Sequence, residues 1–295
     1  MAIRNVGIIG CGTMGAGIAQ IALQAGYLVT VNEINRELLD KGLERIHSSL
    51  DKMQGKGLID DAQKDEMIKR LSGTTTLNEL DQCDLVIEAV IESLDVKIKL
   101  FAALDAVCKK EAIFASNTSS LSVTQIAAAT SRLKQFIGLH FFNPPTLMPL
   151  VEVIRTMTTD KAVLQETIDF VKSLKKVAIV AKDSAGFIVN RLLTPYLLDA
   201  IRAVGDDVGS VEDIDAGMKL GCNHPMGPLM LADFIGLDVL YNAANILFEE
   251  YREKRYAPPP ILKRLVIMGH IGTKAGMGFY DWSDMKKPKP AQLAV

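Results

Sequence analysis

The sequence has little of what marks secreted, metal-binding or nucleic-acid-binding proteins. Its four cysteines, Cys11, Cys83, Cys108 and Cys222, are scattered through 295 residues. Their spacing matches neither a disulfide framework nor a zinc site, so we expect no metal and a reducing, cytoplasmic compartment. The 33 basic and 35 acidic residues leave a formal net charge of −2. Because nucleic-acid-binding proteins carry basic patches, nucleic acid is not an expected partner.

Long apolar segments are also scarce. The main apolar segment, residues 6–26, has the hydropathy of a signal peptide or membrane span. However, four glycines fall within its first eleven residues, and Gln20 and Gln24 interrupt it. No small-residue cleavage motif follows a compact apolar core. The segment is therefore interpreted as a buried strand followed by a helix, and no membrane partner is expected.

Short apolar runs alternate with helical patterns through the first part of the chain. Several runs are continuously apolar, which is typical of strands in a parallel sheet covered on both faces. We therefore predict an α/β domain with a doubly wound, Rossmann-type sheet over residues 1–184. The expected strands are Asn5–Ile9, Leu28–Asn32, Leu85–Ala89, Ala112–Ser116, Phe136–His140, Val151–Arg155 and Val177–Ala181.

Two departures from this alternation define the remaining organisation. Residues 37–71 show helical spacing broken at 54–57, which predicts a helical hairpin inserted after the second strand. Its lysines are either a solvated face or contacts for an anionic ligand. After 184 the strand signals end, and Asp183 or Ser184 is placed to cap a helix through Phe187. Residues 185–295 are predicted to form an all-α C-terminal domain for substrate binding and homodimerisation through its helices.

A glycine cluster follows the first predicted strand and opens the first helix: Gly10, Cys11, Gly12, Thr13, Met14 and Gly15. Glu33 follows 23 residues after Gly10, at the end of the second strand. This is the context of the dinucleotide-binding fingerprint, in which a helix N-terminus faces the pyrophosphate. A carboxylate at 33 accepts hydrogen bonds from a ribose and repels a 2′-phosphate, so NAD is favoured. Arg36 lies close enough to keep NADP open.

Only four histidines are present, and one of them ends a predicted strand. His140 lies where ligands bind in open α/β sheets. Glu152 follows inside an apolar run, where an unpaired carboxylate is costly. A carboxylate on one ring nitrogen leaves the other nitrogen free as a base. The pair is thus either catalytic or a satisfied structural histidine, and spacing alone does not decide.

Two further polar features carry the same ambiguity. The segment 116–120, Ser-Asn-Thr-Ser-Ser, follows a strand end and is either a substrate-binding loop or a turn. Asn190 either reaches the site from the first helix of the second domain or caps a loop. His224, in a rigid proline-containing turn, is expected to be structural.

With these features together, the chain resembles the L-3-hydroxyacyl-CoA dehydrogenases, most closely the short bacterial 3-hydroxybutyryl-CoA dehydrogenases. The resemblance runs almost end to end and rests on specific motifs in order: GCGTMG, DLVIEAVIE, ASNTSSLSVTQIA, IGLHFFNP, LVEVI, DSAGFIVNR and GMGFYDW. It implies that His140 is the general base, that Glu152 partners it, and that Ser119 and Asn190 complete the catalytic site.

The resemblance also implies which residues bind ligands. Cofactor contacts would come from the 10–15 loop, Glu33, and from Glu92, Lys97, Ser119, Asn143 and Lys274. Substrate contacts would come from Ser119 and Asn190, with Ser49 and Lys56 of the hairpin for coenzyme A. Relatives mostly carry aspartate where this chain has Glu33.

The function implied is NAD-dependent interconversion of a (3S)-3-hydroxyacyl-CoA, such as 3-hydroxybutyryl-CoA, and a 3-ketoacyl-CoA such as acetoacetyl-CoA. Fatty-acid and butanoate metabolism both use this chemistry. Two alternatives from other classes stay open, because fold does not fix function. One is a non-catalytic NAD-binding sensor or structural protein, and the other is a sugar-acid dehydrogenase.

Overall fold

The fold is that of a computed structural model in which residues 3–291 are described. The chain divides into two compact units, Met1–Phe187 and Ile188–Val295, and each is described by itself.

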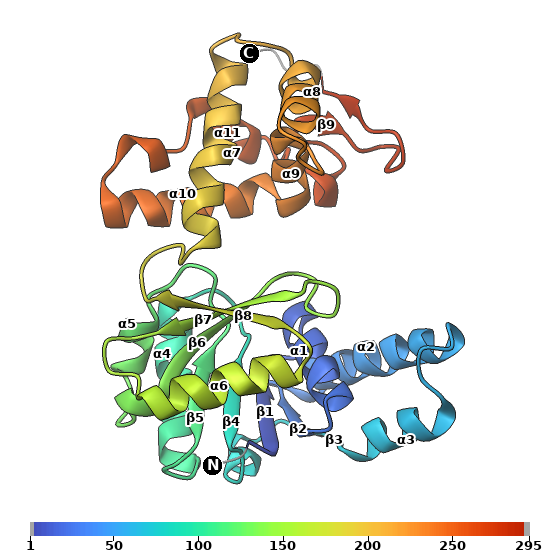
Figure 1. Ribbon diagram of the computed structural model, residues 1–295, viewed down its shortest axis with the longest axis vertical. Coiled ribbons are helices and arrows are strands. Elements are labelled where there is room, and N and C mark those ends of the chain that lie inside the picture. The colour runs from blue at the N-terminus through green and yellow to red at the C-terminus, as the bar shows by residue number, and fades with distance from the viewer. Residues whose placement is uncertain (1–2, 292–295) are drawn as a thin grey trace. The chain divides into compact units, whose positions relative to one another are not determined.

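An eight-stranded sheet forms the centre of the first unit (Figure 1). Its order is β3-β2-β1-β4-β5-β6-β7-β8, and every neighbouring pair is parallel except β6–β7. Since the chain passes from β3 across β1 to β4, the switch point where ligands bind in such sheets lies between β1 and β4. The strands are β1 (Asn5–Ile9), β2 (Leu28–Asn32), β3 (Leu71–Thr74), β4 (Leu85–Glu88), β5 (Ile113–Ser116), β6 (Phe136–Phe141), β7 (Leu150–Arg155) and β8 (Val177–Lys182).

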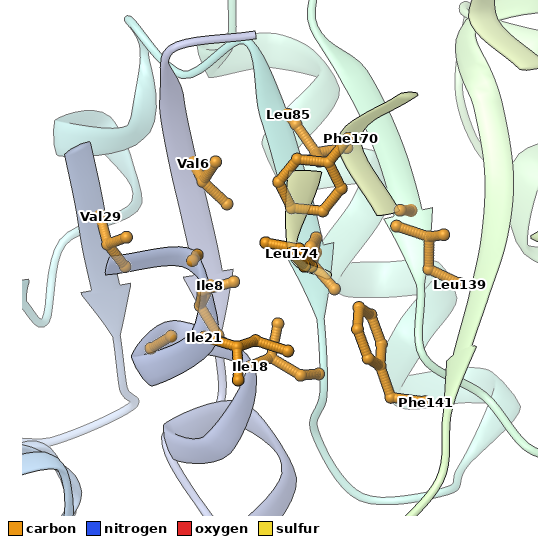
Figure 2. Close-up of a cluster of buried hydrophobic side chains, with 14 of the residues drawn as sticks. Val6, Ile8, Ile18, Ile21, Val29, Leu85, Leu139, Phe141, Phe170 and Leu174 are labelled. Carbon is orange, nitrogen blue, oxygen red and sulfur yellow. The ribbon is translucent and has the colours of Figure 1, made fainter. Parts of the chain in front are cut away.

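Helices bury both faces of this sheet, which explains the continuously apolar strands. On one face, side chains such as Val6, Ile8 and Leu139 pack against Ile18 and Phe170 (Figure 2). These come from α1 (Thr13–Gln24) and α6 (Lys161–Ser173). The opposite face packs against α4 (Leu94–Val107) and α5 (Val123–Ala127), with η1 (Leu77–Leu80) and η2 (Leu133–Gln135) as short connectors.

The predicted Rossmann-type architecture is confirmed, with two differences in detail. Strand β3, Leu-Ser-Gly-Thr, was not predicted because it is short, half polar and contains a glycine. Strand β7 runs antiparallel to β6 because only eight residues separate them, too few for a parallel crossover.

The helical hairpin lies where the sequence predicts it, beside the β2–β3 edge (Figure 1). Helix α2 (Arg36–Gly55) begins at Asn35, whose side chain accepts the Leu38 amide. Helix α3 (Asp61–Lys69) begins with a capping box between Asp60 and Gln63. Gly57 adopts a positive φ of 67°, which ends the first helix.

The second unit is mostly helical, as predicted, with its own apolar core. Its elements are α7 (Val189–Gly205), α8 (Val211–Gly221), α9 (Pro228–Ile235), α10 (Leu237–Tyr251), η3 (Lys254–Tyr256), α11 (Pro260–Ile267), η4 (Thr273–Ala275) and a small ribbon of β9 (Tyr280–Asp281) and β10 (Lys289–Pro290). Gly236, with φ of 99°, separates α9 from α10.

The start of α7 corrects one prediction. Neither Asp183 nor Ser184 caps this helix, because Gly186 and Phe187 adopt positive φ angles of 75° and 47° and delay it to Val189. The Asp183 carboxylate instead accepts the amides of Val123 and Thr124 at the start of α5. The sequence signal for a cap was therefore real, but it acts on a distant helix.

Across residues 3–291, no individual helix combines the length and apolar character needed to cross a bilayer. The α9–α10 pair passes that test jointly, by length and composition, but it bends by 94° at the break.

Candidate active site

The glycine loop connects β1 to α1 at the switch point of the sheet. Gly10 has φ of 85°, and a Cβ there would lie 2.7 Å from the Ala89 carbonyl oxygen of the neighbouring strand end. A Cβ at Gly15 would lie 1.7 Å from the Gly10 carbonyl oxygen, so the helix approaches the loop as closely as glycine permits. At Gly12, by contrast, a Cβ would have no non-neighbouring atom within 4 Å among the described residues.

This geometry fits a dinucleotide. Gly12 is the N-cap of α1 and has no side chain to occupy the helix terminus. The first amides of α1 and the positive end of its dipole are therefore available to a pyrophosphate. The space at Gly12 lets a ligand approach the backbone, which is the role of the second glycine of the fingerprint.

Glu33 lies at the same loop. Its Oε1 accepts the Cys11 amide at 2.6 Å, and its Oε2 accepts the Ile34 amide at 3.2 Å. Burial raises the pKa of the Cys11 thiol to about 12, and the Glu33 carboxylate adds to the rise. Arg36 pairs with Asp40 at 2.8 Å, one turn along the exposed face of α2.

The central pair of the site joins two antiparallel strands. His140 in β6 lies directly opposite Glu152 in β7, and His140 Nδ1 is 2.7 Å from Glu152 Oε2. Glu152 is fully buried and His140 is 6% exposed. In a neutral imidazole, a carboxylate that accepts the Nδ1 proton leaves the lone pair on Nε2. The pair therefore has the form of a positioned general base.

Two aromatic rings enclose the imidazole. The Phe142 ring centroid lies 4.5 Å from that of His140, and the Phe187 centroid lies 5.7 Å away. Phe187 is itself 3% exposed. This packing restricts the imidazole to one orientation and strengthens its interaction with Glu152 by excluding water.

The loop after β5, which contains Ser119, is fixed beside the end of β6. The Asn117 side chain accepts the Phe141 amide at 3.0 Å, which ties this loop to the residue after His140. Glu92 Oε1 accepts the Thr118 hydroxyl at 2.6 Å and the amides of Ser119 and Ser120 at 2.9 and 3.3 Å. The same oxygen accepts the Ser119 hydroxyl at 3.2 Å. Glu92 therefore holds this loop in place through the hydrogen bonds that it accepts.

A buried lysine joins Glu92 to a second carboxylate. Lys97 is 1% exposed, and its Nζ lies 3.2 Å from Glu92 Oε2 and 2.5 Å from Glu88 Oε1. Glu88 is fully buried and also accepts the Ser116 hydroxyl and the Val90 amide. Burial alone would raise the pKa of Glu92, but Lys97 and the hydrogen bonds from Thr118 and Ser119 hold it below its ordinary value.

The hairpin offers a groove of about 380 Å³ along α2. Ser49 lines it together with four charged side chains and a second serine, namely Lys41, Glu44, Arg45, Ser48 and Lys52. Arg45 also donates to the Cys11 carbonyl at 3.4 Å, which connects the groove to the glycine loop. Lys56 is exposed at the C-cap of α2 and is not among the lining residues.

The remaining predicted site residues belong to other segments of the chain. Asn143 is exposed in the loop between β6 and β7. Asn190 occupies the first turn of α7, and Lys274 lies in η4, paired with Asp238 at 2.7 Å. Both belong to the second unit, whereas His140, Glu152, Ser119, Glu92 and Lys97 belong to the first.

Two residues that organise the site were not singled out from the sequence. Glu88 lies in Leu-Val-Ile-Glu, where a charge at the end of a buried strand was a visible signal. Asn117 was seen only as part of a polar segment, and its bond to Phe141 depends on the pairing of β5 with β6.

The switch-point glycine loop and the His–Glu pair at the strand ends define a class, the dinucleotide-dependent oxidoreductases. Two family models narrow it: the NAD binding domain of 3-hydroxyacyl-CoA dehydrogenase matches residues 5–184, and its C-terminal domain matches residues 186–282. The chain belongs to the 3-hydroxyacyl-CoA dehydrogenase family, as the sequence motifs predict.

Relatives that match nearly the full length of the chain support its assignment to this family. The chain is 45% identical over 283 residues to the 3-hydroxybutyryl-CoA dehydrogenase of Mycobacterium tuberculosis, covering 95% of this chain and 99% of the relative. It is 42% identical over 287 residues to the mitochondrial hydroxyacyl-coenzyme A dehydrogenase of Homo sapiens, covering 95% and 91%. The crystal structure of (S)-3-hydroxybutyryl-CoA dehydrogenase from Ralstonia eutropha superposes with a TM-score of 0.93 at 42% identity, covering 96% and 100%.

Proposed function

We propose that this chain interconverts (3S)-3-hydroxyacyl-CoA and 3-ketoacyl-CoA with NAD, and that 3-hydroxybutyryl-CoA and acetoacetyl-CoA are its short-chain pair. The observation that carries this proposal is the 2.7 Å contact between His140 Nδ1 and the buried Glu152 carboxylate. It supports a base held at the carboxyl ends of the strands, where a dinucleotide fold binds its ligands. The names of the relatives support the substrate class.

The residues would work as follows. Bound NAD supplies the hydride acceptor. His140 Nε2 takes the proton of the 3-hydroxyl, and Glu152 stabilises the imidazolium that results. In the reverse direction His140 returns that proton to the oxygen at C3. The Ser119 hydroxyl holds the substrate oxygen on a loop fixed by Glu92, and such positioning lowers the barrier by several kcal/mol, on the order of a hundredfold or more in rate.

Ligand binding would draw on the residues described above. The 10–15 loop and Glu33 would hold the cofactor's pyrophosphate and ribose, and Arg36, paired with Asp40, leaves Glu33 to select NAD. Asn143 and Lys274 would contact the cofactor. The α2 groove with Ser49, and Lys56 beyond it, would take the phosphates of coenzyme A.

We assign residues 185–295 to substrate binding, through Asn190, and to homodimerisation. Strongly exposed apolar side chains support a partner surface on this unit, among them Leu192 at 70%, Leu220 at 85% and Ile267 at 74% exposed. Sedimentation equilibrium of the whole chain tests the assignment: a dimer is expected, and a monomer at micromolar concentration contradicts it.

The decisive experiment is oxidation of NADH with acetoacetyl-CoA, followed by absorbance, for the wild type and His140→Gln. We expect turnover to fall by on the order of 10²–10⁴ in the variant, which is the usual contribution of general acid–base catalysis. Free acetoacetate and sugar acids serve as competing substrates. Turnover of free acids without a requirement for coenzyme A would favour the sugar-acid alternative, and absence of turnover with intact NADH binding would favour a non-catalytic protein.

A further inference from the structure

The cluster Glu88–Lys97–Glu92 has more acids than bases. Lys97 is the single cation between two carboxylates, and it contacts both within 3.2 Å. Glu152, the other buried carboxylate of the site, has His140 as its own partner. The cluster therefore carries one negative charge that no member compensates, provided that both of its carboxylates are ionised.

The hydrogen bonds that the two carboxylates accept favour the ionised form. Glu88 accepts the Val90 amide, the Lys97 ammonium and the Ser116 hydroxyl. The Ser116 hydroxyl oxygen itself accepts the Thr118 amide.

Glu92 is surrounded by donors in the same way. It accepts from Lys97, from three groups on Ser119 and Ser120, and from the Thr118 hydroxyl. The Thr118 hydroxyl oxygen in turn accepts the Leu121 amide. A carboxylate that only accepts hydrogen bonds, and donates none, is favoured in its charged form.

The uncompensated charge lies toward the ligand side of the sheet. Glu88 and Lys97 are closed off from solvent, whereas Glu92 keeps 35% of its side-chain surface exposed. Its Oε1 also holds the loop that contains Ser119, and this loop is joined to the end of β6 beside His140. A cofactor whose reactive ring faces His140 would therefore feel the charge of this cluster.

We propose that this cluster discriminates between the two redox forms of the cofactor. The inference rests on the proposed function. The nicotinamide ring is positively charged in NAD⁺ and neutral in NADH, so a fixed negative charge lowers the free energy of the first complex but not of the second. The ammonium group of Lys97 forms ion pairs with both Glu88 and Glu92. Within this cluster Lys97 therefore positions the two carboxylates and neutralises one of their two negative charges.

The charge of the cluster can affect cofactor binding without contacting the nicotinamide ring. A tenfold preference corresponds to about 1.4 kcal/mol. At an effective dielectric constant of about 20, a unit charge produces that energy at roughly 12 Å. The charge therefore need not touch the ring.

The test compares dissociation constants of NAD⁺ and NADH, measured by calorimetry and by NADH fluorescence without substrate. For Glu92→Gln we expect the ratio Kd(NAD⁺)/Kd(NADH) to rise about tenfold, mainly through weaker NAD⁺ binding. Glu88→Gln removes the same charge from the closed end of the cluster and should raise the ratio as well.

Glu111→Gln is the matched control, since it removes one exposed charge at the turn before β5, at the amino-terminal end of the strand and therefore opposite the carboxyl ends where the cluster lies. Its ratio should equal that of the wild type. A ratio within twofold of the wild type in both Glu92→Gln and Glu88→Gln, or equal weakening of both redox forms, would overturn the inference. A wild type that binds neither form would refute the proposed cofactor function itself, which NADH fluorescence reports separately. Thermal unfolding identifies any variant that fails to fold, and the remaining variants then decide.

Discussion

Replacing Glu152 by glutamine removes the carboxylate behind His140 while keeping the size of the side chain. The amide retains one acceptor, but it has no charge to stabilise an imidazolium. Its NH₂ group can also donate to Nδ1, which places the imidazole proton on Nε2, the atom proposed to act as the base. We therefore expect Glu152→Gln to be slow even though His140 is present.

The magnitude follows from the contact distance. Two unit charges at 2.7 Å interact by about 6 kcal/mol at an effective dielectric constant of about 20. If the imidazole carries about half of its positive charge in the transition state, the loss is about 3 kcal/mol. Each 1.36 kcal/mol corresponds to a tenfold change, so kcat should fall by about 10². The altered tautomer adds to this, and the expected range is on the order of 10²–10³.

The assay is steady-state reduction of acetoacetyl-CoA by NADH, with NADH affinity measured in parallel. Affinity should change less than threefold, because Glu152 is fully buried and acts through His140. The double variant His140→Gln/Glu152→Gln should be no slower than His140→Gln alone, since the carboxylate has no role without the imidazole. Thermal unfolding of each variant shows whether a lower rate reflects loss of folded protein, because removing one partner of a buried ion pair often destabilises the fold.

Two results would refute the reasoning. One is a Glu152→Gln variant with kcat within threefold of the wild type. The other is a double variant whose loss equals the sum of the two single losses in free energy, which would mean that Glu152 acts independently of the imidazole.

Further expectations follow from other parts of the structure. Gly12→Ala should keep the wild-type melting temperature but bind NADH about tenfold or more weakly, whereas Gly15→Ala should lower the melting temperature, because only the latter Cβ meets backbone. Ionised Glu92 stabilises the fold above its ordinary pKa of 4.5, and this contribution is lost as the pH falls through its lower folded pKa; unfolding free energies from pH 6 to 3 should thus decline less steeply in Glu92→Gln. Asp233→Asn should destabilise the second unit by roughly 2–4 kcal/mol in urea unfolding, since this fully buried carboxylate accepts two amides and an indole N–H. Native protein should take up about one equivalent of iodoacetamide at Cys222, because this thiol is exposed and the other three are buried.

Much of the first unit could be predicted from its sequence because local and global signals agree. Short apolar runs, several of them continuous, marked seven of its eight strands, and the glycine fingerprint marked the loop at the switch point. The exceptions are instructive. Strand β3 carries almost no strand propensity, and it forms because β2 offers an edge to pair with.

The contact between His140 and Glu152 was predictable from the sequence, whereas the contacts of Lys97 were not. His140 and Glu152 were paired on the cost of burying a lone carboxylate, and the structure gives the reason for their spacing, a direct cross-strand position. The burial of Lys97 between two acids, by contrast, depends on α4 packing against the ends of β4 and β5. No local pattern predicts such a contact, because it joins residues from three elements.

The antiparallel β6–β7 pair is the feature of the fold on which the proposed chemistry depends most. In a fully parallel sheet, a histidine at the carboxyl end of one strand faces residues that also lie at strand ends, close to water. Here the reversal of β7 places the third residue of a buried strand, Glu152, opposite His140. The carboxylate is thus fully buried while the imidazole keeps a small exposed edge. The proposed mechanism needs both a strong charge interaction and access of the base to substrate, two requirements that normally oppose each other. Different residues on adjacent strands would meet them.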